Sequence, residues 1–229
     1  LSAGSKALAE HHSRRGVRAR VHAIEDQPGF YETIYDSVDI ETHIIVLPFD
    51  DKVTCVEYIN LLTGALGNKK KFTIHIQQLP SNQNFSNKVN IQTYQQSTDI
   101  ESILKNIKSK IKSKESPVVI INGIVIPSTK DSINQLTSAV SQEQSIEVIV
   151  PLALAEDKST IVASGKIAYN RTFIDMFAGS HKGRHTYMGN TDWMRNVDLP
   201  NELCYAFLAK NIELISALWR SGTQSPQLS

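Results

Sequence analysis

The stretch THIIVLPF, residues 42–49, is a continuous apolar run without the polar alternation of a half-exposed strand. Such runs are typical of strands that are buried on both faces of a sheet. Asp50 and Asp51 follow at once, and their side chains can cap the first turn of a helix. Apolar residues then recur at helical spacing until Gly64 or Gly67. This part of the chain therefore predicts a buried strand followed by a helix.

Strands and helices alternate in the same way along the rest of the chain. Apolar, β-branched segments predict further strands over residues 70–79, 88–94, 116–127, 145–154 and 172–179, with 116–127 forming one strand or two around a bulge. Apolar residues at helical spacing predict helices over 98–111, 128–140 and 198–220, the last beginning after Pro200. Strands that lack polar positions are typical of a mostly parallel sheet with helices on both faces. We therefore expect a doubly wound α/β fold.

The beginning of the chain has a different pattern. A helix is expected over residues 5–15, where it ends at Gly16, and an alternating strand over 17–26. Residues 27–41 are expected to connect this part to the buried strand. The predicted organisation is the end of a preceding lobe with a connector (1–41), an α/β domain (42–220) and a flexible tail (221–229).

Composition argues against several classes of protein. Of the 229 residues, 24 are Lys or Arg and 23 are Asp or Glu, so a formal net charge of +1 gives no general reason to bind nucleic acid. Cys55 and Cys204 lie far apart in apolar helical patterns and are expected to be buried thiols. No apolar run reaches the ~18 residues that a membrane span needs. The chain begins at Leu1 without a visible signal peptide, so we expect a piece of a longer protein.

The stretch FIDMFAGSHKGRHTYMGNTDW, residues 173–193, places glycines, hydroxyls and basic side chains directly after a predicted strand. At the carboxyl end of such a strand, backbone N–H groups can hold an anion while lysine and arginine supply charge. The predicted ligand-binding residues are Gly179, Ser180, Lys182, Gly183, Arg184, Gly189 and Thr191. Their spacing matches neither common phosphate-binding motif, and the alternative is a solvated turn that needs glycine for its backbone conformation.

Two other features have simpler explanations. His181 and His185 have the spacing of zinc ligands on a helix, but Gly183 disfavours a helix and no nearby cysteine or carboxylate completes the set, so no metal site is expected. A series of lysines lies opposite an isoleucine stripe on one predicted helix: Lys105, Lys108, Lys110, Lys112 and Lys114. Such a face can lie against anionic lipid or an acidic partner, but we favour an ordinary solvated surface.

Several stretches, taken in order, resemble one known family. HIIVLPFDDKVTCVEYINLL is similar to a buried strand that the family follows with paired aspartates and a helix. FIDMFAGSHKGRH, MGNTDW and LPNELCYAFLA resemble its last strand, the following loop and the start of its final helix, and VRARVHAIED resembles the strand that closes its first lobe. The family is the C-terminal cytosolic region of monovalent cation/proton antiporters, which includes plant cation/H+ exchangers and fungal endomembrane K+/H+ antiporters.

The resemblance implies a universal-stress-protein-like (Rossmann-like) α/β module that lies beneath a membrane transporter. It would regulate a K+(Na+)/H+ antiporter at the cytosolic face of an endomembrane, such as that of the Golgi, vacuole or endosome. Its partners would be the transmembrane part of the same antiporter and a second copy of itself, without nucleic acid. ATP and AMP are the candidate ligands of the glycine-rich loop, and the seven histidines would suit the module to pH sensing.

Two alternatives stay open. One is a stand-alone nucleotide-binding stress-type protein, whose gene would encode no upstream membrane spans. The other is a sugar-nucleotide-dependent transferase that uses Asp50 and Asp51 with a metal ion, as in glycosyltransferase-like folds. Because the sequence contains no G-x-S-x-G elbow, no H-E-x-x-H motif and no spaced acid–base pair, we expect no catalysis.

Overall fold

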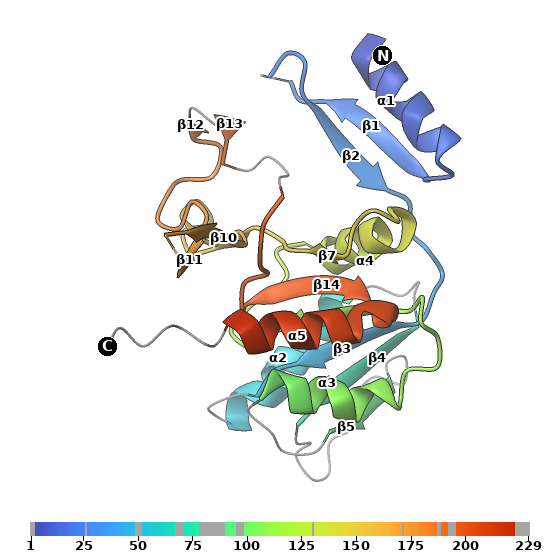
Figure 1. Cartoon of the computed structure of the whole chain (residues 1–229), viewed down its shortest axis with the longest axis vertical. Helices are drawn as coiled ribbons and strands as arrows, with labels where there is room; N and C mark the ends of the chain where they lie inside the picture. Colours follow the sequence, from blue (N-terminus) through green and yellow to red (C-terminus); the bar gives the residue numbers. More distant parts are fainter. Residues whose placement is uncertain are drawn as a thin grey trace.

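The computed structural model describes residues 3–25, 27–48, 52–66, 71–77, 90–94, 99–129, 131–170, 172–186, 189–191 and 196–222. At its centre lies a six-stranded sheet with the order β5-β4-β3-β6-β14-β7 (Figure 1). The strands are β3 (Thr42–Val46), β4 (Phe72–Ile76), β5 (Asn90–Thr93), β6 (Pro117–Ile121), β7 (Val148–Ile149) and β14 (Cys204–Leu208). The predicted mostly parallel central sheet is confirmed.

One strand of this sheet runs against the others. β5, β4, β3 and β6 pair in parallel, and Ile44 of β3 lies between Ile74 of β4 and Val119 of β6. β14 is antiparallel to both of its neighbours, β6 and β7. Because two antiparallel pairings reverse the direction twice, β7 again runs parallel to β6.

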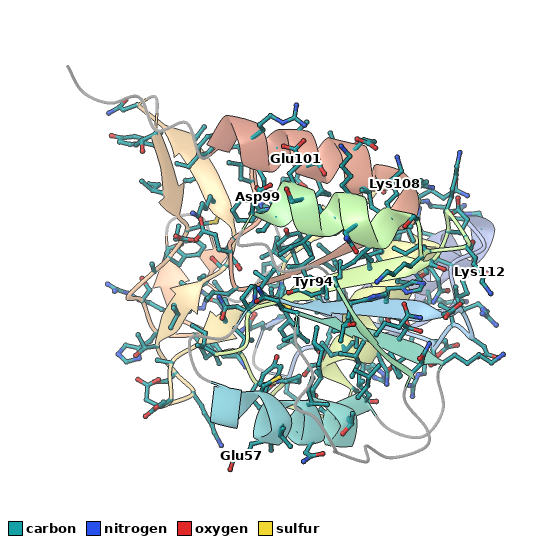
Figure 2. The ribbon with its side chains drawn as sticks, turned by 90° about the horizontal axis from the view of Figure 1, so that it is seen from below. Glu57, Tyr94, Asp99, Glu101, Lys108 and Lys112 are labelled. Atoms are coloured by element: carbon teal, nitrogen blue, oxygen red, sulfur yellow. The ribbon has the colours of Figure 1, made fainter. Side chains whose placement is uncertain are left out.

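Helices cover both faces of the sheet, as the alternation of the sequence predicts. α2 (Lys52–Leu66) and α4 (Ser132–Gln142) pack on one face, and α3 (Ile100–Lys108) and α5 (Ile212–Gly222) pack on the other. Figure 2 shows these layers, with the sheet between α2 and the α3–α5 pair. Side chains alternate along a strand, so Ile44 faces α2 and α4 whereas Ile45 faces α3 and α5.

The segment 198–220 departs most from the sequence-based prediction. The sequence predicts one helix after Pro200, whereas the structure has β14, the short 3-10 helix η1 (Ala209–Asn211) and then α5. All residues of β14 are buried, including Cys204, which was expected in a helix. The same apolar residues fit a helical stripe or a short buried strand, and periodicity alone cannot separate the two. Hydrogen bonding to two neighbouring strands decides in favour of the strand.

Two other predicted strands take a different form. Residues 145–154 contain only β7, at the edge of the sheet, and β8 (Ala153–Leu154), which pairs with β9 (Ile161–Ala163) outside the sheet. Both strands are half-buried, because β7 is the edge strand of the central sheet and β8 lies outside this sheet. Within 172–179, β11 (Thr172–Asp175) pairs with β10 (Lys166–Tyr169) in a separate hairpin. The segment 116–127 forms the single strand β6 and then a turn.

The N-terminal unit packs on α4 at the side of the central domain (Figure 1). It consists of α1 (Ala3–Arg14) and a hairpin of β1 (Ala19–Ala23) and β2 (Tyr31–Tyr35), of which β2 was not predicted. The side chain of Gln135 accepts a hydrogen bond from Tyr35 N (2.9 Å) and donates one to Tyr35 O (3.1 Å). Gln142 likewise accepts from Arg18 N (2.7 Å) and donates to Asp36 O (2.8 Å). Two glutamines of α4 thus satisfy backbone groups of the hairpin.

The helix α3 is shorter than the predicted range 98–111. Asp99 is the N-cap: its carboxylate accepts hydrogen bonds from Glu101 N (3.2 Å) and Ser102 N (2.9 Å). Thr98 lies outside the described residues. α3 ends at Lys108, so the last three lysines of the series follow the helix and the five do not form one helical face. Lys108 pairs with Glu213 of α5, and this ion pair fits the favoured interpretation of a solvated surface (Figure 2).

His43 and His75 form a buried pair on the face of the sheet that α3 covers. His43 Nδ1 and His75 Nε2 are 3.0 Å apart, and the two residues are 2% and 0% exposed. The outer ring nitrogens, His43 Nε2 and His75 Nδ1, have no hydrogen-bond partner. Burial lowers the pKa of both rings, and nearby His43 and Lys110 help to bring the pKa of His75 to about 3. Both histidines are therefore neutral near pH 7.

This pair should make the fold sensitive to acid. Between pH 7 and pH 5 the unfolded chain protonates His75 near the ordinary pKa of 6.5, while the folded chain does not. The free energy of unfolding should therefore fall by about 2 kcal/mol from this residue, and the loss should continue until the pH approaches the lowered pKa. Chemical denaturation at both pH values measures the change.

His75→Gln should lose most of this pH dependence, whereas His22→Gln, at an exposed position of β1, should retain it. An equal loss of stability on acidification in wild type and in His75→Gln would contradict the assignment.

Candidate functional site

The order of the strands reverses between β3 and β6. From β3 the chain proceeds through β4 to β5 on one side, and then returns to add β6 on the other side. In open α/β sheets, ligands bind outside the carboxyl ends of the strands at such a reversal, because the connections diverge there. The candidate site is therefore the edge of the sheet at the carboxyl ends of β3 and β6, which we call the switch edge.

The turn after β6 forms one side of the switch edge. Asn122 accepts a hydrogen bond from Ile124 N on its side-chain oxygen (3.1 Å) and one from Val125 N on its carbonyl (2.9 Å). Asn122 N donates to Leu203 O (2.8 Å), which ties this turn to the segment that leads into β14. Ile124, at the tip of the turn, is 77% exposed. The backbone is therefore held firmly while its tip faces solvent.

Two tyrosines brace the strand ends from opposite faces of the sheet. Tyr94, which follows β5, donates to Val46 O (2.8 Å), and Tyr58 of α2 donates to Val125 O (2.8 Å). They are 4% and 3% exposed, and burial raises the pKa of both hydroxyls above its usual range. Figure 2 shows Tyr94 between α3 and the sheet. Because each phenol stays protonated and donates to a carbonyl, the two residues position the edge rather than act as acids or bases.

The segment before β14 forms the other side of the switch edge. Asn201 Oδ1 accepts hydrogen bonds from Leu203 N (2.9 Å) and Cys204 N (3.1 Å), so it caps the start of the strand. Asn201 is 2% exposed, and its Nδ2 has no hydrogen-bond partner. A buried amide donor without an acceptor is unusual, because an unpaired buried polar group costs about 1–3 kcal/mol.

A charged group flanks this segment. Lys166 Nζ is 2.5 Å from Glu202 Oε1, and Lys166 lies opposite Asp175 in the β10–β11 ladder. Asp175 Oδ1 is buried without a hydrogen-bond partner. Burial raises the pKa of Asp175, Lys166 opposes this effect and Glu202 adds to it. A hollow of about 50 Å³ lies between Lys166, Glu202, Phe173 and Trp219.

A larger hollow of about 730 Å³ lies along the edge strand β7. Residues 145–152 form one wall, and Met176, Phe177, Thr191 and Val197 contribute to the other. Its lining is mainly apolar and its volume falls in the range of small-molecule sites. It is separated from the switch edge by β14, which lies between β7 and β6.

The glycine-rich loop does not follow a strand of the central sheet, so the expectation that it lies at the carboxyl end of such a strand is wrong. The strand before it, β11, belongs to the β10–β11 hairpin and ends at no sheet edge of the doubly wound domain. The backbone amides expected to hold an anion are engaged: Gly179 N donates to Ile161 O (2.8 Å) and Lys182 N to Ser159 O (2.7 Å).

The other predicted residues of the loop are similarly placed. Ser180 N donates to Phe177 O (2.9 Å), and Arg184 N is shared between His181 O (3.3 Å) and Thr191 Oγ1 (3.2 Å). Thr191 is 2% exposed and its hydroxyl donates to His181 O (2.8 Å). Gly183 has φ +74°, and Gly189 lies in β13 (Gly189–Asn190), which pairs with β12 (His185–Thr186). The side chains of Lys182 and Arg184 are exposed, and anion binding by the loop stays a prediction.

Sequence reasoning overlooked the residues that build the switch edge. The Asn-Gly pair at 122–123 is a recognised turn signal, but it lay inside a segment that also fitted a bulged strand. Asn201 could not be found, because the segment around it was predicted to begin a helix. Asp50 and Asp51, which follow β3 in the sequence, lie outside the described residues. Among the residues that the structure does describe, no cluster of three or more His, Cys, Asp or Glu side chains could hold a metal ion.

Comparison with models of known protein families finds no match, and comparison with curated proteins finds no significant relative. Within the described ranges, no helix combines the length and the apolar character that crossing a membrane requires.

Removing the Tyr94 hydroxyl should loosen the switch edge. Tyr94→Phe leaves the buried Val46 carbonyl without this donor, so we expect the free energy of unfolding to fall by about 1–2 kcal/mol. Tyr169→Phe, at a position that is 59% exposed, is the matched control and should leave stability unchanged. Urea denaturation measures both; an unchanged midpoint for Tyr94→Phe would show that the brace does not contribute.

Proposed function

We propose that this chain is a nucleotide-binding α/β domain of the sugar-nucleotide transferase type, with the nucleotide at the switch edge. The observation that carries the proposal is the sheet order, which reverses between β3 and β6 and then inserts the antiparallel β14 before β7. The reversal supplies the crevice in which open α/β sheets bind nucleotides. The paired aspartates after β3 support the choice of class.

A doubly wound domain of the Rossmann type would continue outward from β6 with further parallel strands. Here β14 lies between β6 and β7, and it brings Asn201 and its neighbours to the carboxyl ends of the parallel strands. Glycosyltransferase-like folds are the class that Asp50 and Asp51 after a buried strand suggest. This is an analogy of fold, and the site chemistry has to support it separately.

The sequence after β3 offers that chemistry. In the sequence, Asp50 and Asp51 come four and five residues after Val46, the last residue of β3. Carboxylates at the carboxyl end of a central strand suit Mg²⁺ or Mn²⁺, which in turn binds the diphosphate of a sugar nucleotide. In this proposal the aspartates hold the metal ion, and the braced turns at Val46 and Asn122 hold the nucleotide.

The competing proposal is the universal-stress-protein-like regulatory domain of an antiporter. The parallel order β5-β4-β3-β6 also suits a nucleotide such as ATP or AMP, so this proposal shares the switch edge. It gives no role to the antiparallel β14. Its further expectations, namely an absence of catalysis, a transmembrane partner, a homodimer and an endomembrane location, stay predictions.

Ligand titration separates the two proposals. UDP-glucose, GDP-mannose, ATP and AMP are added to the chain with Mn²⁺ or with EDTA, and the melting temperature and sugar-nucleotide hydrolysis are followed. We expect a sugar nucleotide with Mn²⁺ to stabilise the fold, by about 2.7 kcal/mol at a hundredfold excess over the dissociation constant. Asp51→Asn should abolish the metal-dependent part.

The double variant Lys182→Ala, Arg184→Ala is the control and should bind as the wild type does. Stabilisation by ATP or AMP alone, without metal, would instead support the stress-type domain, and its loss in the double variant would assign the nucleotide to the glycine-rich loop rather than to the switch edge. No stabilisation by any nucleotide would reject both proposals.

A further inference from the structure

The hollow beside β14 belongs to the same edge of the molecule as the carboxyl end of β6. Its floor is the segment 198–203, which is tied to β10 by hydrogen bonds from Lys166 N to Leu199 O (2.8 Å) and from Leu199 N to Lys166 O (3.1 Å). The hydrogen bond from Asn122 N to Leu203 O (2.8 Å) joins this segment to the turn after β6. Three elements therefore hold the hollow in place next to the switch edge.

Two aromatic side chains stand at this hollow. Trp219 of α5 donates from Nε1 to the hydroxyl of Tyr205 (2.7 Å), and Tyr205 is 0% exposed. This bond fixes the indole plane before any ligand arrives, which lowers the entropic cost of binding. Phe173 of β11 is 41% exposed and contributes a second ring. Aromatic walls of this kind pack well against the C–H face of a ring-shaped ligand.

The charges around the hollow argue against a second anion site. Lys166 is neutralised by Glu202 at 2.5 Å and faces Asp175 across the β10–β11 ladder. Two carboxylates against one ammonium leave this place with an excess of negative charge. A phosphate would be repelled here, whereas an uncharged polar ligand would not.

The ion pair at the hollow offers both kinds of hydrogen-bonding group. The Lys166 ammonium is a donor, the Glu202 carboxylate is an acceptor, and both residues line the hollow. A hydroxyl group both donates and accepts, so a ligand with several hydroxyls can bond to both side chains. A phosphate or carboxylate can bond only to the donor.

We propose that this hollow binds a neutral, hydroxyl-rich ring, that is, one sugar unit. The inference rests on the proposed function and assigns a carbohydrate subsite to Trp219, Phe173 and the Lys166–Glu202 pair. The space of about 50 Å³ admits a few water-sized groups, so one edge of a pyranose enters while the rest extends toward solvent.

The test uses methyl α-glycosides of glucose, galactose and mannose, with inorganic phosphate as the charged comparison. Saturation-transfer NMR reports binding. Tryptophan fluorescence, recorded on a Trp193→Phe variant that keeps a single tryptophan, reports the environment of Trp219. We expect at least one glycoside to bind in the millimolar range, about 1–10 mM for so small a ligand, and phosphate not to compete with it.

One variant and its matched control probe the subsite. Phe173→Ala removes an exposed ring and should weaken glycoside binding about tenfold, whereas Tyr169→Ala, on the same hairpin but outside the hollow, should not.

Absence of glycoside binding, or binding that Phe173→Ala does not weaken, overturns the subsite. These results are independent of the nucleotide titration. If UDP-glucose binds with Mn²⁺ but no glycoside does, the proposed function stands and the subsite fails. If glycosides bind in the expected pattern but no nucleotide does, the chain is a carbohydrate-binding domain and the transferase proposal fails.

Discussion

The insertion of β14 into the sheet is the constraint on which the rest of the molecule depends. Its backbone pairs with β6 and β7, and its side chains enter both hydrophobic layers. Tyr205 and Phe207 pack with α3 and α5, whereas Cys204 and Ala206 pack with α2 and α4. One five-residue strand therefore joins the two layers of the domain and extends the parallel sheet to its edge. A strand buried on both faces needs the apolar run CYAFL, and no polar position interrupts it.

The same strand creates the candidate site. Because β14 runs against β6, its first residue lies beside the last residue of β6, and the segment before it is carried to the carboxyl edge. There Asn201 caps the strand, and Leu203 accepts the hydrogen bond from Asn122. Just before Asn201, Leu199 forms backbone hydrogen bonds with Lys166 of β10. The tyrosine braces add rigidity from both layers, so the edge is preformed. Preformed edges bind ligands without a large ordering cost.

The outer hairpins follow a different physical rule from the core. β8 to β13 form two-stranded pairs whose residues are mostly half-buried or exposed, apart from Ile161 and Ala163 of β9 and Asn190 of β13, which are buried. The glycine-rich loop is of this kind: its amides donate to protein carbonyls, and its basic side chains project into solvent. A pattern of glycine, lysine and arginine looks the same in the sequence whether its N–H groups are free or engaged. Only the partners of these groups distinguish an anion site from a well-ordered turn.

The sequence by itself determined the parallel half of the molecule. The runs THIIV, FTIHI and PVVII are rich in apolar, mostly β-branched residues, and with the intervening helix stripe at Ile103, Leu104 and Ile107 they predict a layered α/β core. Only the tertiary structure decided that 204–208 is a strand, that β11 stays outside the sheet and that Asn201 reaches the switch edge. The physical reason is that a short apolar segment satisfies helical and strand periodicity equally well. Its choice rests on backbone hydrogen bonds to strands that lie many residues away in the chain.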